Sequence, residues 1–199
     1  MPNGANPLKV RGEAMNDLYR GYLVRLSAVS PEIMAQSNLK WNRDSEAQRL
    51  ANDDPTQMFS EKYLKEKSAK YDSNPDLFRF AVFPLEGDAH LGEAAIWVEP
   101  WSHAEAWTGI LIGEREYWGK GYGTDAMRLV AQYGFLELGM RRISLALHAF
   151  NERARKSYEK IGFVAEGVRR GVLLRDGVRY DEIVMGLLRE EWLAMRGAA

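Results

Sequence analysis

The chain contains no cysteine among its 199 residues. This excludes disulfide bonds, a cysteine nucleophile and metal sites built from thiolates. No apolar run reaches the roughly 18 residues that a membrane-spanning helix needs, and the N-terminus lacks the hydrophobic stretch of a signal peptide. We therefore expect a cytoplasmic protein without a membrane partner.

The sequence also lacks an excess of charge of either sign. Its 27 Lys and Arg residues nearly balance its 28 Asp and Glu residues, so electrostatics give no reason to expect binding to nucleic acid or to an anionic membrane. The three histidines, His90, His103 and His148, are widely separated, and neither an H-E-x-x-H motif nor an aspartate cluster is present. We expect no metal site, and we interpret His148 as a structural polar group.

The length and the apolar content of 46% suit a single globular domain. Residues 1–16 are polar and interrupted by glycine and proline, which predicts a flexible leader before a domain spanning residues 17–195.

Hairpin patterns occur at both ends of this domain, around a strand–helix–strand segment. Glu86-Gly87-Asp88 separates two apolar runs, and Asp176-Gly177 separates two more. The predicted strands are residues 22–26, 77–85, 91–98, 107–112, 142–148, 163–174 and 178–188. The predicted helices are a short one after Ser30, residues 56–71, residues 124–138 and one that begins after Asn151. This order predicts an α+β fold in which helices flank a mixed, mostly antiparallel sheet.

Three alternating glycines, Gly119, Gly121 and Gly123, follow the third central strand and precede a helix. Glycine allows the backbone to approach a ligand closely, and a helix N-terminus offers unpaired N–H groups and partial positive charge. The segment therefore predicts a cradle for phosphate or diphosphate. It is neither a Walker loop, because Lys120 is followed by glycine, nor a dinucleotide fingerprint, because Thr124 replaces the last glycine. A tight strand–helix connection without a ligand is the alternative.

A second block follows one strand later, and together the two blocks resemble a known family. The first is Glu116-Tyr-Trp-Gly119-Lys-Gly121, and the second has Asn151, Ala154, Tyr158, Lys160, Gly162 and Phe163. Over roughly residues 106–188 the chain resembles the GNAT (Gcn5-related) N-acetyltransferase superfamily, in particular its ribosomal-protein-alanine acetyltransferase-like branch. The family usually has Gln or Arg where this chain has Glu116, so we expect that side chain to face solvent.

The resemblance implies a single-domain GNAT fold and acetyl-CoA as co-substrate, with no metal. It implies that Tyr158 is the general acid that protonates the departing thiolate, and that Asn151 hydrogen-bonds the pantetheine arm or the adjoining phosphate region. From the helix pattern alone, Tyr158 could equally be a core aromatic residue and Asn151 a helix cap. The implied co-substrate-binding residues are Ile110, Leu111, Ile112, Trp118, Gly119, Lys120, Gly121, Tyr122, Gly123, Thr124 and Asn151.

The attacking amine must be neutral, so a carboxylate acting through water could serve as the base. Glu93, Glu99 and Glu105 are the candidates. The related branch often has a glutamate where this chain has Trp107, and Glu105 lies two positions earlier, on the same strand face. We therefore rank Glu105 first, while a solvated carboxylate, or a water chain with no dedicated base, is the alternative.

The resemblance implies direct transfer of acetyl to a primary amine in a ternary complex, most readily to the α-amine of a protein N-terminus. A polyamine or another small amine, including an antibiotic, is an alternative acceptor. A non-catalytic acyl-CoA-binding sensor is the alternative from another class. The variable N-terminal half, around Trp41, is where this family usually forms its acceptor pocket, and a homodimer stays open.

Overall fold

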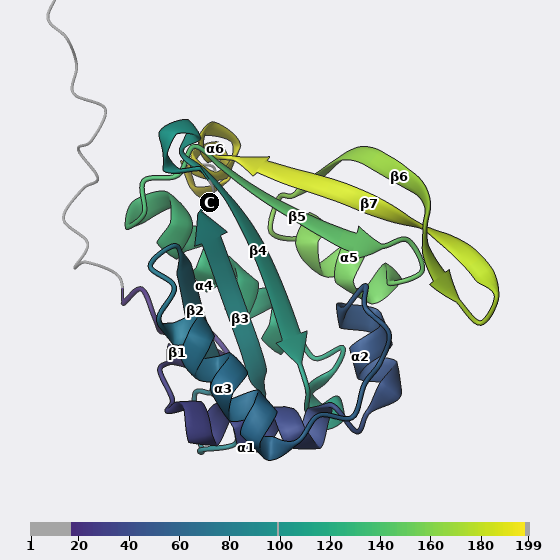
Figure 1. Cartoon of the computed structure of the whole chain (residues 1–199). Coiled ribbons are helices and arrows are strands. Elements are labelled where there is room, and N and C mark those ends of the chain that lie inside the picture. Colours follow the sequence, from purple (N-terminus) through teal and green to yellow (C-terminus); the bar gives the residue numbers. More distant parts are fainter. Residues whose placement is uncertain (1–16, 99, 198–199) are drawn as a thin grey trace, which may run out of the picture.

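The computed structural model describes residues 17–98 and 100–197, so the predicted leader and Glu99 lie outside it. In this part of the chain, seven strands form one sheet in the order β1-β2-β3-β4-β5-β7-β6 (Figure 1). All neighbouring strands are antiparallel except β4 and β5, which are parallel. The strands are β1 (Val24–Ser27), β2 (Leu77–Pro84), β3 (Gly92–Val98), β4 (Glu105–Ile112), β5 (Arg142–His148), β6 (Val164–Arg175) and β7 (Val178–Leu188).

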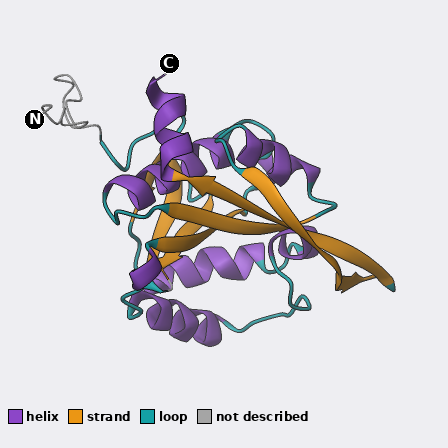
Figure 2. Ribbon diagram, turned by 90° about the horizontal axis from the view of Figure 1, so that it is seen from above, coloured by secondary structure: helices purple, strands orange, loops and turns teal. Residues whose placement is uncertain are grey.

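Helices cover both faces of the sheet, which makes three layers (Figure 2). In Figure 1, α1 and α3 lie in front of the sheet and α4 lies behind it. The α-helices are α1 (Pro31–Trp41), α2 (Ser45–Ala51), α3 (Glu61–Asp72), α4 (Tyr122–Leu136), α5 (Glu152–Glu159) and α6 (Arg189–Gly197). Two short 3₁₀ turns, η1 (Trp101–His103) and η2 (Arg115–Tyr117), lie on either side of β4.

The predicted α+β fold is confirmed, and most differences concern the boundaries of elements. The helix expected at residues 56–71 begins at Glu61, because the side chain of Ser60 accepts a hydrogen bond from the Tyr63 amide and so caps it. Helices α2 and α6 were not predicted. The first has only seven residues, and the second follows β7 directly, without a turn pattern to separate them.

Tight packing joins α4 to the middle of the sheet. Gly134 lies on the inner side of this helix, and a Cβ atom there would stand 2.7 Å from the side chain of Ile96 and 2.8 Å from that of Ile143. Close packing of this kind buries large apolar area, which is the main favourable term in folding. It fixes α4, and with it the glycine loop at its N-terminus.

The parallel strands β4 and β5 are neighbours only over their first three residue pairs, Glu105–Arg142, Ala106–Ile143 and Trp107–Ser144. Beyond Trp107 the two strands diverge, as Figure 1 shows, while β4 stays paired with β3 and β5 with β7. One edge of residues 108–112 therefore has no strand partner. The wedge between the strands is the main feature that positions the site.

Candidate active site

A cavity of about 720 Å³ lies in the wedge between β4 and β5. We call it the donor cavity. It brings together most of the residues predicted to bind the co-substrate, although they come from β4, the glycine loop, α4 and α5. Those that line it are Ile110, Leu111, Ile112, Trp118, Gly119, Gly121, Gly123, Thr124 and Asn151, together with Tyr158. Lys120 and Tyr122 do not line it.

The glycine loop has the backbone geometry of an anion cradle. Gly119 and Gly121 have φ angles of +72° and +91°, a region that favours glycine. Gly121 is the N-cap of α4, and no side chain caps the helix there. A Cβ atom added to Gly119 would meet no heavy atom within 4 Å. Because the first N–H groups of α4 have no side-chain cap and the loop borders a cavity, these residues fit a phosphate-bearing ligand.

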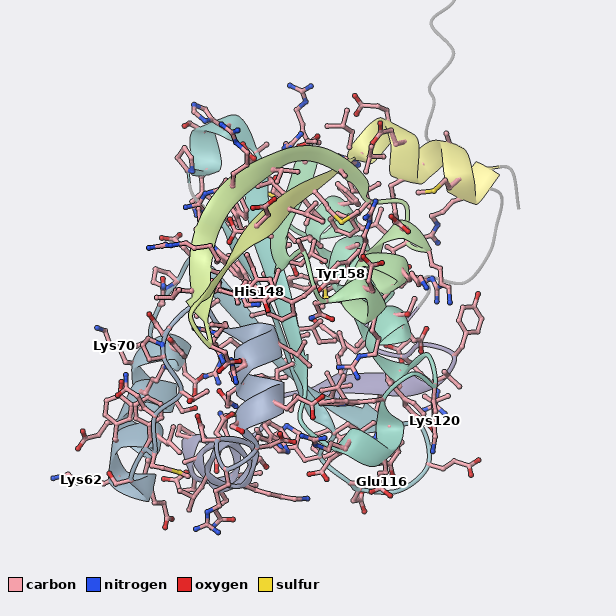
Figure 3. The ribbon with its side chains drawn as sticks, turned by 90° about the vertical axis from the view of Figure 1, so that its right-hand side faces the viewer. Lys62, Lys70, Glu116, Lys120, His148 and Tyr158 are labelled. Atoms are coloured by element: carbon pink, nitrogen blue, oxygen red, sulfur yellow. The ribbon has the colours of Figure 1, made fainter. Side chains whose placement is uncertain are left out.

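Cations of α5 and of its C-cap residue line the donor cavity beside this loop. Arg153, Lys156 and Lys160 all contribute to its wall. The guanidinium of Arg153 lies 3.8 Å from the ring centroid of Trp118, and the Trp118 indole N–H donates to the carbonyl of Ile112 at 2.6 Å. Within the described residues none of the three cations has a carboxylate partner. Glu116 is exposed, as expected, and lies with Lys120 on the outer side of the loop (Figure 3).

The phenol of Tyr158 reaches the donor cavity from α5, and only 7% of the residue is exposed. Burial raises the pKa of this phenol to about 12, because water can no longer stabilise the phenolate. Tyr158 therefore carries its proton at neutral pH, as a general acid must. Its ring packs against Phe163 at a centroid distance of 6.0 Å, so the residue is also part of the core.

Asn151 caps α5 and also ties it to α2. Its Oδ1 accepts a hydrogen bond from the Ala154 amide at 3.2 Å, and its Nδ2 donates to the Leu50 carbonyl at 3.3 Å. The capping interpretation thus describes the side chain, which lines the donor cavity at the same time.

Glu105 lies elsewhere. It begins β4, at the end of the strand opposite the glycine loop, and it lines neither this cavity nor the one described next. Its Oε1 accepts hydrogen bonds from Arg142 Nε at 3.2 Å and from Ser144 Oγ at 3.1 Å. The sequence ranked Glu105 first as a base acting through water, and in the structure two partners from β5 hold its carboxylate outside both cavities.

A second cavity, of about 810 Å³, lies between α3 and strands β2, β3 and β4. We call it the acceptor-side cavity. It shares Gly109, Ile110 and Leu111 of β4 with the donor cavity. Of the three carboxylates considered from the sequence, Glu93 lines this second cavity, where its Oε2 accepts a hydrogen bond from Arg79 Nη2 at 2.8 Å.

The segment that follows α2 borders both cavities, and residues from distant parts of the chain hold it. Asn52 and Asp54 line the two cavities. Arg175 Nη2 donates to the carbonyls of residues 52, 53 and 54 at 2.7, 3.1 and 3.2 Å. His148 Nε2 lies 2.7 Å from Asp53 Oδ1, so His148 has a structural contact. Sequence reasoning missed Arg175 and Asp53.

Asp125 was also missed. Its carboxylate is buried in the first turn of α4, and its Oδ2 accepts hydrogen bonds from the amides of Leu23 at 2.7 Å and Val24 at 3.1 Å. It therefore fastens the start of β1 to the helix that carries the glycine loop. An acidic residue two positions after the last glycine, in the first turn of the expected helix, is the pattern that could have revealed it.

A divided sheet, a glycine loop at an uncapped helix N-terminus and a protonated tyrosine meet in one cavity, an arrangement that suits an acyl-CoA-dependent acetyltransferase domain. The family model described as an acetyltransferase (GNAT) domain matches residues 24–164. The chain belongs to this family, as its motifs had indicated, and GNAT acetyltransferases use acetyl-CoA.

Relatives with two kinds of name match parts of the chain. A Bacillus subtilis protein provisionally named ribosomal N-acetyltransferase YdaF is 37% identical over 78 residues, which cover 39% of this chain and 43% of the relative. The spermidine N(1)-acetyltransferase of Escherichia coli K12 is 34% identical over 92 residues, covering 46% of this chain and 49% of the relative. These matches span about half the length of the relatives.

Solved structures agree over nearly the whole fold. The spermidine N-acetyltransferase of Vibrio cholerae, solved in complex with CoA and spermine, has a TM-score of 0.74 at 24% identity and covers 85% of this chain and 98% of its own. A GNAT-family acetyltransferase from Bacillus anthracis has a TM-score of 0.73 at 20% identity and covers 87% and 99%. At these identities the likeness shows the fold. Within the described residues, no helix is long and apolar enough to cross a membrane, and no cluster of three metal-binding side chains exists.

Proposed function

We propose that the protein is an N-acetyltransferase that moves the acetyl group of acetyl-CoA directly to a primary amine, most readily the α-amine of a protein or peptide. The observation that carries the proposal is the meeting of two cavities at Gly109, Ile110 and Leu111 of β4. One cavity has the phosphate cradle and the other has room for an acceptor. The family membership and the relatives named as N-acetyltransferases support the same reaction.

Each residue has a role that follows from its place. Acetyl-CoA supplies the acetyl thioester, and the backbone amides of the glycine loop and the cations of α5 bind its phosphates. Tyr158 holds a proton in the donor cavity for the thiolate that leaves. The N–H groups of a strand alternate in direction, and that of Gly113 faces β3, so Ile110 or Ile112 can present an N–H to the wedge that stabilises charge on the thioester oxygen.

We assign the base to Glu93, acting through water. Of the two sequence candidates that the structure describes, Glu93 and Glu105, it is the one that lines the acceptor-side cavity. Its pairing with Arg79 fixes its position. An amine that binds as a cation must lose a proton before attack, and a fixed carboxylate across a water can accept it.

The charges of the acceptor-side cavity favour a peptide over a polyamine. Its three carboxylates are Asp54, Asp76 and Glu93, and its two cations are Lys67 and Arg79. Glu93 is paired with Arg79, and Asp76 accepts a hydrogen bond from the Trp101 indole at 2.6 Å. This leaves little negative charge for a ligand with three or four ammonium groups. Amide side chains also line the cavity, and two of them, Asn38 and Gln57, make no side-chain hydrogen bond within the described residues and so can bond to a peptide backbone.

The test is release of free thiol from acetyl-CoA with three acceptors: a peptide with a free α-amine, the same peptide blocked at its N-terminus, and spermidine. We expect turnover with the first. Tyr158→Phe should lower kcat by about 100-fold or more, as expected for a general acid. Tyr133→Phe is the matched control, since Tyr133 is a half-buried tyrosine of α4 that lines neither cavity.

Acetylation of spermidine in preference to the peptide would show that the acceptor is a polyamine and not a peptide, and the rest of the proposal would stand. Binding of CoA without turnover on any amine would instead support the alternative, a non-catalytic acyl-CoA-binding sensor.

A further inference from the structure

Lys67 is a cation in the acceptor-side cavity that has no carboxylate partner in the described part of the chain. It lies on α3, is half-buried and lines the cavity wall. Two other lysines of this helix have acidic partners within 4.0 Å: Lys62 pairs with Glu66 at 3.9 Å and Lys65 with Glu32 at 2.6 Å. Both of these lysines are exposed. Lys70, the fourth lysine of α3, is exposed and also has no carboxylate within 4.0 Å in the described residues, so the feature that distinguishes Lys67 is its half-buried place in the cavity wall.

Aromatic rings hold the Lys67 ammonium in place. Its Nζ lies 5.8 Å from the ring centroid of Phe59 and 5.6 Å from that of Tyr71. Contacts of this kind favour a cation by about 0.5–1 kcal/mol each at partly exposed sites. They also restrict the Lys67 side chain before a ligand binds, so that less conformational entropy is lost on binding. The ammonium is therefore positioned before a ligand arrives, with hydrogen-bond donors left over.

Arg79, the other cation of the cavity, is not free in this sense. Its guanidinium donates to Glu93 at 2.8 Å, to Asp72 at 3.2 Å and to the hydroxyl of Ser68 at 3.2 Å. It serves the internal network. Lys67 is the cation available to a ligand.

The acceptor-side cavity has carboxylate and ammonium groups on different walls. Asp54 borders the donor cavity as well as the acceptor-side cavity, so one carboxylate that is not paired with Arg79 lies near the place of transfer. Lys67 lies on the helix that forms the other wall. A ligand with an amine at one end and an anionic group at the other complements this arrangement.

We propose that the acceptor carries an anionic group that pairs with Lys67. In a peptide this group is the side chain of an aspartate or glutamate close to the acetylated N-terminus. The inference rests on the proposed function and names the substrate class of the same cavity.

The experiment compares three peptides that differ at the second residue, with Glu, Gln or Lys there, in steady-state acetylation. For the unaltered protein, kcat/KM should be about tenfold higher for the Glu peptide than for the Gln peptide, mainly through KM, because a charge-assisted hydrogen bond contributes about that factor. Lys67→Met should remove the preference, Lys67→Arg should keep it, and Lys67→Glu should favour the Lys peptide.

Lys70→Glu is the matched control. Lys70 lies on the same helix but does not line the cavity, and Figure 3 shows it with Lys62 on the outer side of α3. Lys70→Glu changes the net charge by the same amount as Lys67→Glu, and the preference for the Glu peptide should survive in it. Thermal unfolding and CoA affinity, measured for every variant, report whether the fold and the donor cavity are intact.

Equal kcat/KM for the Glu and Gln peptides in the unaltered protein overturns this inference and leaves the proposed function standing. So does a preference that persists in a folded Lys67→Met variant. Absence of acetylation with every peptide overturns the proposed function, and the inference with it.

Discussion

Replacing Gly119 by alanine separates the binding role of the glycine loop from its role in the fold. The residue has a φ angle of +72°, and an added Cβ would meet no heavy atom within 4 Å. The substitution therefore causes no clash within the described protein. The left-handed conformation costs an L-residue about 1 kcal/mol relative to glycine, which lowers the melting temperature by roughly 2–4 °C for a domain of this size.

Binding should suffer much more. The added methyl group would stand in the cradle, where a phosphate approaches the backbone amides. Loss of one hydrogen bond to a charged group costs about 1.5–3 kcal/mol, so the Kd for CoA should rise roughly 10- to 100-fold. Isothermal titration calorimetry with CoA measures this change directly.

Gly139→Ala is the control. Gly139 follows the other end of α4, with a φ angle of +68° and no heavy atom within 4 Å of an added Cβ. It should show the same small loss of thermal stability and an unchanged Kd. If both variants bind CoA as the unaltered protein does, the loop does not bind the diphosphate and the reasoning about the donor cavity is refuted.

Three further results are expected. The pKa of Tyr158 is raised from 10.0 to about 12 in the folded protein, so its contribution to stability is complete below pH 10 and is lost as the pH rises through 12. Urea unfolding should show that the unaltered protein loses about 2–3 kcal/mol of unfolding free energy relative to Tyr158→Phe over this interval. Equal pH dependence of the unfolding free energy in the two proteins would contradict this. Asp125→Ala leaves two backbone amides without their acceptor, so the free energy of unfolding should fall by about 3 kcal/mol, whereas a change below about 1 kcal/mol would show that water replaces the carboxylate. Glu93→Gln should lower kcat near neutral pH while Glu105→Gln leaves it unchanged, and the opposite pattern in a thiol-release assay would restore Glu105 as the base.

The predictions for the donor side of the site rest on local patterns. The glycines, the N-cap Asn151 and the helix position of Tyr158 are properties of short segments, and the structure brings these segments to one cavity. Each depends on backbone preferences that neighbouring residues determine. The fold class followed from the order of strands and helices for the same reason.

The acceptor side depends on contacts between distant residues, which a single sequence does not reveal. Glu105 was ranked first from its strand face, but its partner Arg142 comes from the next strand and occupies its carboxylate. Arg175 contacts carbonyls more than a hundred positions earlier in the chain. Asp125 joins a helix to residues near the start of the fold in the same way. Neither spacing nor periodicity carries that information.

The contacts at the tip of the β6–β7 hairpin bear on how access to the donor cavity can open. Near the mouth of the wedge, Arg175 grips three carbonyls and Asp176 pairs with Arg49, and all of these bonds are solvent-exposed. Water can replace such bonds at a small cost in free energy. Separation of α4 from the sheet would expose the apolar layer between them and would cost more. Loosening of this rim therefore costs less free energy than separation of α4 from the sheet, and we expect the rim to open first.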